Sequence, residues 1–194
     1  MTADDPIRAF VELFEQATQV CTPEDASAMV LATADAAGRP SSRFVLLKAV
    51  DRRGFVFYTN LESRKARELR QRAAASLCIY WAPLGKQVRI EGSVEQVSNP
   101  EADEYFAARP REFQVSAWAS RQSAPLKSRE ELERRVQEVE AQFEGRPVPR
   151  PPFWSGFRIV PDRIEFWTHR PNRLHERVLY ERHGDRWLAS PLYP

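Results

Sequence analysis

The sequence has few cysteines and no long apolar run. Its 194 residues include only Cys21 and Cys78, which are far apart and form no CxxC or Cys/His spacing. This argues against a disulfide framework and favours a reducing compartment. No stretch approaches the ~20 apolar residues of a membrane helix, and residues 1–7 lack the basic and apolar regions of a signal peptide. We therefore expect a cytoplasmic protein with no membrane partner.

Glycine and net charge are also low. With 7 glycines, the chain has neither a GxGxxG motif nor a P-loop, so side chains would have to hold any phosphate. Its 29 basic residues are offset by 27 acidic ones, which leaves a net charge of +2. This balance gives no reason to expect nucleic-acid binding, although a local basic cluster would suit a small anion. The length and an apolar fraction of 42% suit a single domain over residues 1–194.

The first half of the chain predicts an N-terminal helix followed by short strands, with one short helix among them. The helix begins at Pro6, because proline suits the first helical position and apolar residues follow at helical spacing. A short basic helix is capped by Ser63 and runs to residue 69. Strands separated by turns are expected over residues 29–34, 43–50, 55–59, 75–81 and 87–97.

Helices return in the middle of the chain. One is expected over residues 101–108 behind an Asn99 cap, and a second begins with the capping box of Ser128 and Glu131. Four more strands are expected over residues 154–159, 163–168, 177–181 and 187–189. Many short strands surrounded by helices indicate an α+β domain built on an antiparallel barrel, without the βαβ alternation of a dinucleotide-binding fold.

Two basic clusters are candidate anion sites. Arg64 and Lys65 follow Ser63 at a predicted helix start, where free N–H groups and the helix dipole also favour an anion; a solvated helix face is the alternative. Arg43 and Lys48 bracket an apolar strand, and alternation places them on opposite faces. They would then serve two anions, unless a bulge at one edge brings them together; surface charges at strand ends are the alternative.

The segment 164–177 gathers Trp167, Arg173, His175 and Arg177. A flat aromatic cofactor could use the indole as a wall and the guanidiniums as partners for its carbonyls or charge. His175 on its own is more often structural, and it has no second His or Cys at ligand spacing, so we expect no metal site.

Several motifs, in order and at matching spacing, resemble the pyridoxine 5′-phosphate oxidase family. They extend from about Pro6 to Pro194 and include residues 43–48, 57–65, Gln87, 105–110, 117–123, 153–158 and 164–177. Each motif is weak alone, but together they make a strong match. The resemblance implies an antiparallel FMN-binding split β-barrel with surrounding helices, assembled as a homodimer with FMN at the subunit interface.

The resemblance also implies residue roles. The residues that would contact FMN are Arg43, Phe44, Val45, Leu46, Tyr58, Thr59, Arg64, Lys65, Gln87, Gln122, Ser123, Trp167 and Arg177. The substrate phosphate would be bound by Lys48, Tyr105 and Arg109, whose side chains suit a dianion. Arg173 and His175, the expected catalytic pair, would also bind the substrate by facing its ring.

The implied reaction converts the 4′ alcohol of pyridoxine 5′-phosphate, or the 4′ amine of pyridoxamine 5′-phosphate, to the aldehyde of pyridoxal 5′-phosphate. O2 would reoxidise the flavin with release of H2O2, so the protein would supply position and electrostatics. Whether the alcohol or the amine is preferred stays open. So do the existence of a regulatory pyridoxal-phosphate site and the choice between a proton-transfer and an orienting role for His175.

Two features depart from the family pattern. Phe113 stands where the best-known members carry a serine, four residues after Arg109. The lost hydrogen-bond donor would cost ~1–2 kcal/mol of phosphate binding. The chain also begins close to its first helix, so we expect it to lack the longer N-terminal segment that covers the substrate in many relatives.

These departures leave two alternatives. A phenazine-pathway flavin oxidase shares the RLHER and RQS motifs; Lys48 and Tyr105 favour vitamin B6 chemistry over it, whereas Phe113 does not. A non-catalytic flavin- or pyridoxal-phosphate-binding protein is the other, and the presence of Arg173 and His175 argues against it.

Overall fold

The computed structural model describes residues 5–194. Residues 1–4, which belong to the segment 1–7 expected to lack a signal peptide, lie outside the described residues. The elements are α1 (Pro6–Val20), α2 (Pro23–Ser27), β1 (Ala28–Ala34), β2 (Pro40–Leu46), β3 (Ala49–Asp51), β4 (Gly54–Asn60), α3 (Arg64–Gln71), β5 (Ala74–Trp81), η1 (Ala82–Leu84), β6 (Lys86–Gln96), α4 (Asn99–Ala107), α5 (Arg111–Ala119), α6 (Arg129–Gln142), β7 (Trp154–Thr168), η2 (Pro171–Arg173), β8 (Glu176–His183) and β9 (Arg186–Leu192).

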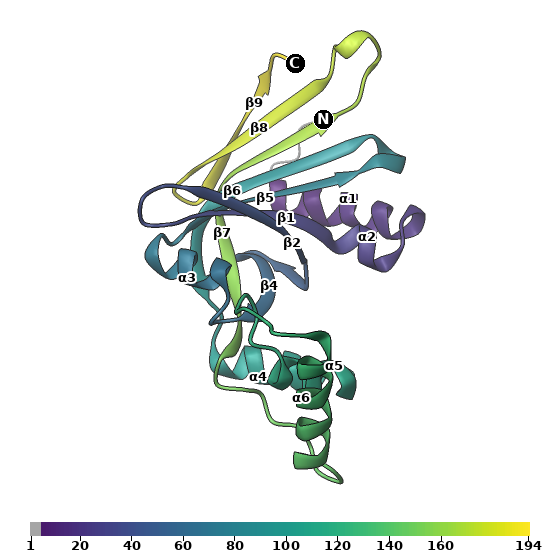
Figure 1. The fold of residues 1–194 in the computed structure, drawn as a ribbon. Coiled ribbons are helices and arrows are strands. Elements are labelled where there is room, and N and C mark those ends of the chain that lie inside the picture. The colour runs from purple at the N-terminus through teal and green to yellow at the C-terminus, as the bar shows by residue number, and fades with distance from the viewer. Residues whose placement is uncertain (1–4) are drawn as a thin grey trace.

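The strands form one antiparallel sheet with the order β2-β1-β5-β6-β7-β4-β3, and β8 and β9 continue it from β7. Figure 1 shows the sheet curled, with α1 and α2 on one side and α4, α5 and α6 gathered at one end. The α+β architecture on a curled antiparallel sheet agrees with the sequence prediction. None of the helices in the described part of the chain is long and apolar enough to cross a membrane.

Helix α1 closes the core of the curled sheet. The side chain of Asp5 caps it by accepting from the backbone N–H of Ile7 at 2.9 Å, and Pro6 begins it as predicted. The ring of Phe10 is fully buried and meets Phe55 edge-on with centroids 4.8 Å apart. The indole N–H of Trp81 donates to the carbonyl of Ala26 at 2.9 Å, so the core polar group is satisfied.

The single strand predicted over residues 43–50 is wrong, because the chain changes partners at residues 47 and 48. The backbone N–H of Leu47 donates to Ser27 at 2.8 Å, and that of Lys48 donates to Val56 at 2.9 Å. The segment therefore leaves β1 as β2 ends and joins β4 as β3 begins. Strand periodicity detects an extended chain but not a change of neighbour.

The two strands predicted over residues 154–168 are one continuous strand, β7. Pro161 has no N–H for the ladder and sits opposite Gly92, where β6 shifts register. A Cβ on Gly92 would lie 2.0 Å from the carbonyl oxygen of Val160, so only glycine allows this close approach. The glycine accommodates the proline, and β7 pairs with β4 before it and β8 after it.

The end helices pack on a second, smaller core. It contains Phe106, Val115, Phe143 and Trp154. Ser128 caps α6 as predicted, since its hydroxyl accepts from the backbone N–H of Glu131 at 3.3 Å, whereas α4 is capped by Ser98 rather than Asn99. Helix α5 was not predicted as a helix. It begins directly after Pro110, with no side-chain cap.

Candidate functional site

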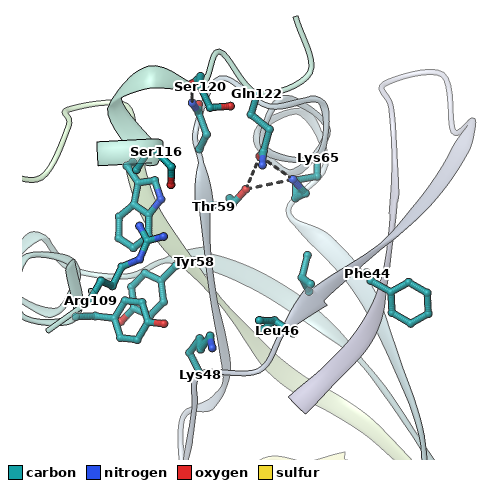
Figure 2. A pocket seen from close by; sticks show the side chains of 15 residues that line it. Phe44, Leu46, Lys48, Tyr58, Thr59, Lys65, Arg109, Ser116, Ser120 and Gln122 are labelled. Carbon is teal, nitrogen blue, oxygen red and sulfur yellow. Dashed lines mark hydrogen bonds between the residues drawn. The ribbon is translucent and has the colours of Figure 1, made fainter. Parts of the chain in front are cut away.

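A cavity of about 480 Å³ lies where β2, β4 and the end helices meet. Figure 2 shows its lining side chains. They are Phe44, Val45, Leu46, Lys48, Tyr58, Thr59, Asn60, Lys65, Tyr105, Arg109, Ser116, Ala117, Ser120, Gln122 and Trp154. The volume falls within the range of small-molecule sites. Of the two charges that alternation was expected to separate, Lys48 lines this cavity and Arg43 does not. Alternation alone does not explain this, because Val45, which it places with Arg43, also lines the cavity, and the strand ends before Lys48.

One end of the cavity holds a buried cation, Lys65, which is 9% exposed. Its ammonium donates to Gln122 at 2.9 Å and to Thr59 at 3.2 Å. Both acceptors are neutral, and within residues 5–194 the ammonium forms no ion pair. Burial is the larger cause and repulsion from Arg43 the smaller one, and together they lower the pKa of Lys65 from 10.5 to about 8. An anion bound here would supply the missing negative charge.

The other end holds Arg109 among aromatic rings. Its guanidinium carbon lies 4.8 Å from the centroid of the Trp154 ring. One of its nitrogens, Nη1, is buried with no hydrogen-bond partner in the described part of the chain. Burial lowers the pKa of Arg109, and no carboxylate pairs with it among residues 5–194. A buried donor without a partner is costly, so this atom points to a ligand.

Stacked aromatics fix the side chains at this end. The rings of Tyr58 and Tyr105 stack with centroids 3.9 Å apart, and Tyr58 stacks on Trp154 at 5.3 Å. Burial and the charge of Glu101 raise the pKa of Tyr58 to about 12. Burial also raises the pKa of Tyr105. Both hydroxyls therefore stay protonated as donors at neutral pH.

Three predicted residues lie beside the cavity without lining it: Arg43, Arg64 and Ser123. The hydroxyl of Ser123 accepts from the backbone N–H of Arg64 at 3.2 Å. Its φ of 71° is left-handed, an unfavourable conformation for a non-glycine residue.

The remaining predicted residues form a separate set on β6, β7, β8, η2 and the loop between η2 and β8. Gln87 pairs with Trp167, which pairs with Arg177. The rings of Trp167 and His175 have centroids 4.6 Å apart. None of these residues, nor Arg173, lines the cavity of the same chain.

The loop carrying Arg173 is strained. Asn172 and Arg173 have φ values of 56° and 61°. Consecutive left-handed non-glycine residues are uncommon, and strain of this kind concentrates at functional sites. His175 accepts through Nδ1 from the backbone N–H of Arg170 at 3.2 Å, which leaves Nε2 for another partner.

The sequence missed several lining residues. Asn60, Ser116 and Ser120 were not singled out. Trp154 is buried in the second core and also lines the cavity. The sequence signal for Asn60, Ser120 and Trp154 was membership in the motifs of residues 57–65, 117–123 and 153–158, whereas Ser116 lies in none of them. Within residues 5–194, no group of three or more His, Cys, Asp or Glu side chains could hold a metal ion.

Comparisons with known proteins give consistent matches. A family model described as pyridoxamine 5′-phosphate oxidase matches residues 14–143. A second, described as the pyridoxine 5′-phosphate oxidase C-terminal dimerisation region, matches residues 154–194. A pyridoxine/pyridoxamine 5′-phosphate oxidase from Myxococcus xanthus is 59% identical over 100% of this chain and 94% of its own. One from Rubrobacter xylanophilus is 57% identical over 98% of this chain and 87% of its own.

Two solved structures share the fold. PhzG from Burkholderia lata, in complex with tetrahydrophenazine-1-carboxylic acid, has a TM-score of 0.91 and 36% identity, covering 99% of this chain and 94% of its own. A pyridoxamine 5′-phosphate oxidase-related, FMN-binding protein from Nostoc punctiforme has a TM-score of 0.79 and 18% identity, covering 100% of both chains, which supports the fold alone.

Proposed function

Because the chain belongs to the pyridoxamine 5′-phosphate oxidase family, we propose that it oxidises pyridoxine or pyridoxamine 5′-phosphate with FMN as cofactor and O2 as electron acceptor. The alcohol and one O2 give pyridoxal 5′-phosphate and H2O2. The amine consumes one water as well and releases ammonia. The observation that carries the proposal is the cavity with an uncompensated cation at each end, Lys65 and Arg109, which suits two phosphorylated molecules.

The Lys65 end suits the phosphate of FMN. The ammonium lacks a carboxylate partner, and Arg43 is close enough to lower its pKa. Thr59 and Gln122 hold the ammonium in place. The strand residues Phe44, Val45 and Leu46 would flank the ring system. When bound, FMN supplies the redox chemistry: acceptance of a hydride from C4′ and delivery of two electrons to O2.

The Arg109 end suits the substrate phosphate. The free Nη1 of Arg109 and the protonated hydroxyl of Tyr105 are donors, and Lys48 adds a third donor and a second cationic group at the same end (Figure 2). Trp154 and Tyr58 hold Arg109 and Tyr105 by stacking, so these groups are oriented before the ligand arrives.

The second set of predicted residues would complete the site from another copy of the chain. Trp167, Arg173, His175 and Arg177 lie within the stretch that matches a dimerisation region. Phe44, which lines the cavity, is 74% exposed in one chain, as expected of a side chain that a partner covers. We therefore propose a homodimer in which FMN lies between subunits, with Arg173 and His175 at the substrate ring.

We also propose that the enzyme works in the cytoplasm. Cys21 and Cys78 are both free thiols, as a reducing compartment would keep them. Fractionation of the native host, with the protein detected by antibody, tests this location.

An anaerobic reduction tests the reaction. The protein is loaded with FMN, oxygen is removed, and pyridoxine or pyridoxamine 5′-phosphate is added while the visible flavin absorbance is followed. Bleaching supports the proposal, and readmitted O2 should restore the colour with formation of H2O2. A flavin that stays oxidised with both substrates would sink the vitamin B6 assignment and leave a phenazine-type oxidase or a binding role.

A phenazine-type flavin oxidase is the second candidate. It is favoured by the likeness to PhzG and by Phe113, which offers a ring rather than a hydroxyl near Arg109. The same anaerobic experiment with a reduced phenazine carboxylic acid separates the two. Bleaching by that compound alone would replace the vitamin B6 assignment.

A further inference from the structure

Glu68, a residue with no role in the proposed reaction so far, lies at the centre of a buried network between α3, β1 and β2. It is 4% exposed. Its Oε1 accepts from Nε of Arg64 at 2.8 Å. Its Oε2 accepts from the hydroxyls of Thr33 at 2.5 Å and Ser41 at 2.6 Å, and from Nη2 of Arg43 at 3.2 Å. One carboxylate thus holds two of the arginines assigned to FMN, Arg43 and Arg64.

The carboxylate is ionised at neutral pH. Burial acts to raise the pKa of Glu68, but hydrogen bonds from Ser41, Thr33, Arg64 and Arg43 outweigh it and lower the pKa from 4.5 to about 2. A buried carboxylate with four donors has little freedom to move, so it defines where the two guanidiniums lie.

The network borders the Lys65 end of the cavity. Arg43 is the charged group whose repulsion contributes to the lowered pKa of Lys65, and Arg64 precedes Lys65 on α3. Three cations at one end of a site would repel one another. Glu68 offsets this repulsion from the side away from the cavity, since it contacts Arg43 and Arg64 but does not line the cavity.

We propose that Glu68 is a positioning residue for the phosphate end of the flavin, fixing Arg43 and Arg64 beside Lys65. The proposal rests on the proposed function only in that FMN places its phosphate at Lys65. Because Glu68 carries a negative charge, its direct effect on a phosphate is repulsive. If Glu68 acts by positioning, removing its charge should weaken FMN binding. If it acts by repulsion, removing its charge should strengthen FMN binding.

The test compares FMN with riboflavin, which has the same ring system without the phosphate. Dissociation constants of both are measured by flavin fluorescence quenching for the wild type and for Glu68→Gln, which keeps the size and one acceptor oxygen. We expect FMN binding to weaken about 10- to 100-fold, the range seen when a partner that orients a ligand-binding side chain is removed at metal sites, while riboflavin binding stays unchanged.

A matched control is Glu133→Gln on α6, because Glu133 forms an exposed pair with Arg129 at 3.0 Å, far along the chain from the network. It should change neither constant. Thermal unfolding of each variant without flavin shows whether the fold is intact, and Glu68→Asp, which keeps the charge on a shorter side chain, serves as a second variant if Glu68→Gln does not fold.

Three outcomes would overturn the role of Glu68. FMN binding that is unchanged or tighter in Glu68→Gln would show that the carboxylate acts only as a repelling charge or not at all. Equal weakening of FMN and riboflavin would show a general structural role. Wild-type protein that binds FMN no better than riboflavin would overturn the phosphate placement itself, and so would separate a failure of the proposed function from a failure of Glu68 alone.

Discussion

The ammonium of Lys65 and the side-chain oxygen of Gln122 lie 2.9 Å apart, joining α3 to the segment that follows α5. The same oxygen accepts from the hydroxyl of Thr59 at 3.0 Å. A buried cation is thus held only by neutral groups, although a buried charge is usually paired. Burying a charge without a countercharge costs free energy, and a bound phosphate would supply the countercharge.

Lys65 should make FMN binding dependent on pH. Its pKa is about 8 without ligand, and a nearby phosphate would raise it, so binding takes up a proton between about pH 8 and the higher pKa of the complex. FMN affinity should fall as the pH rises through this window. Calorimetric titration at pH 8.5 in two buffers of different ionisation enthalpy measures the uptake. Lys65→Met should abolish it, and equal heats in both buffers for the wild type would contradict the assignment.

The same shift predicts the pH dependence of stability without ligand. The folded-state pKa lies below the usual 10.5, so between about pH 8 and 10.5 the unfolded chain binds more protons than the folded one. From this group alone, stability should therefore rise with pH across that window. Urea unfolding at pH 8 and pH 10 measures the change. The rise should be smaller in Lys65→Met; an identical rise would assign it to other groups.

Phe113 should weaken binding of the substrate phosphate. Its ring centroid lies 6.0 Å from the guanidinium carbon of Arg109, and the ring is 52% exposed. Phe113→Ser would add a hydroxyl donor beside Arg109, worth about 1 kcal/mol or roughly a fivefold lower KM for a phosphorylated substrate. Phe113→Ala removes the ring without adding a donor and is the control. If the alanine and serine variants have the same KM, the lost hydroxyl is not what matters.

Local sequence patterns predicted where helices and strands occur better than they predicted which segments pair with one another. Ser63 and Ser128 were recognisable as caps because capping depends on residues within one turn. The strand break at Leu47 was not recognisable, because it results from a backbone hydrogen bond to Ser27. The continuity of β7 depends on Gly92, which is distant in sequence from Pro161. Both depend on contacts that periodicity does not encode.

The same limit applies to the site. The motifs placed Lys48, Tyr105 and Arg109 at one cavity, but nothing local indicated that Glu68 accepts from Arg43 and Arg64. On α3, Glu68 looks like an ordinary i,i+4 partner of Arg64. Its burial follows from the packing of α3 against β1 and β2, which only the tertiary structure reveals.

Glu101 should contribute to stability through a buried arginine. Arg158 on β7 is 1% exposed, and its guanidinium donates to Glu101 at 2.6 Å and to Asp51 at 2.8 Å. Glu101→Gln should lower the free energy of unfolding by about 1.5–3 kcal/mol, the value of a hydrogen bond to a charged group. Urea denaturation measures it. Glu104→Gln, an exposed neighbour on α4, should change stability by less than about 0.5 kcal/mol; equal effects of the two would count against the role of Arg158.

The two separate sets of predicted residues make a dimer prediction that does not depend on which substrate is used. In one chain, Arg109 lines the cavity whereas Arg173 does not. If each site combines the cavity of one subunit with the η2 loop of the other, Arg109→Ala and Arg173→Ala should each inactivate both sites of their own homodimers. A mixed dimer would then contain one site with both defects and one site with neither.

Coexpression of the two variants with different affinity tags tests this arrangement. Random pairing gives half mixed dimers, each with one intact site, so the mixture should regain about a quarter of wild-type activity. Mixed dimers purified on both tags should have about half. Each variant expressed alone is the control and should stay inactive. If Arg109 and Arg173 instead serve a site within one chain, no subunit in the mixture carries both residues, and purified mixed dimers without activity would rule out the shared site.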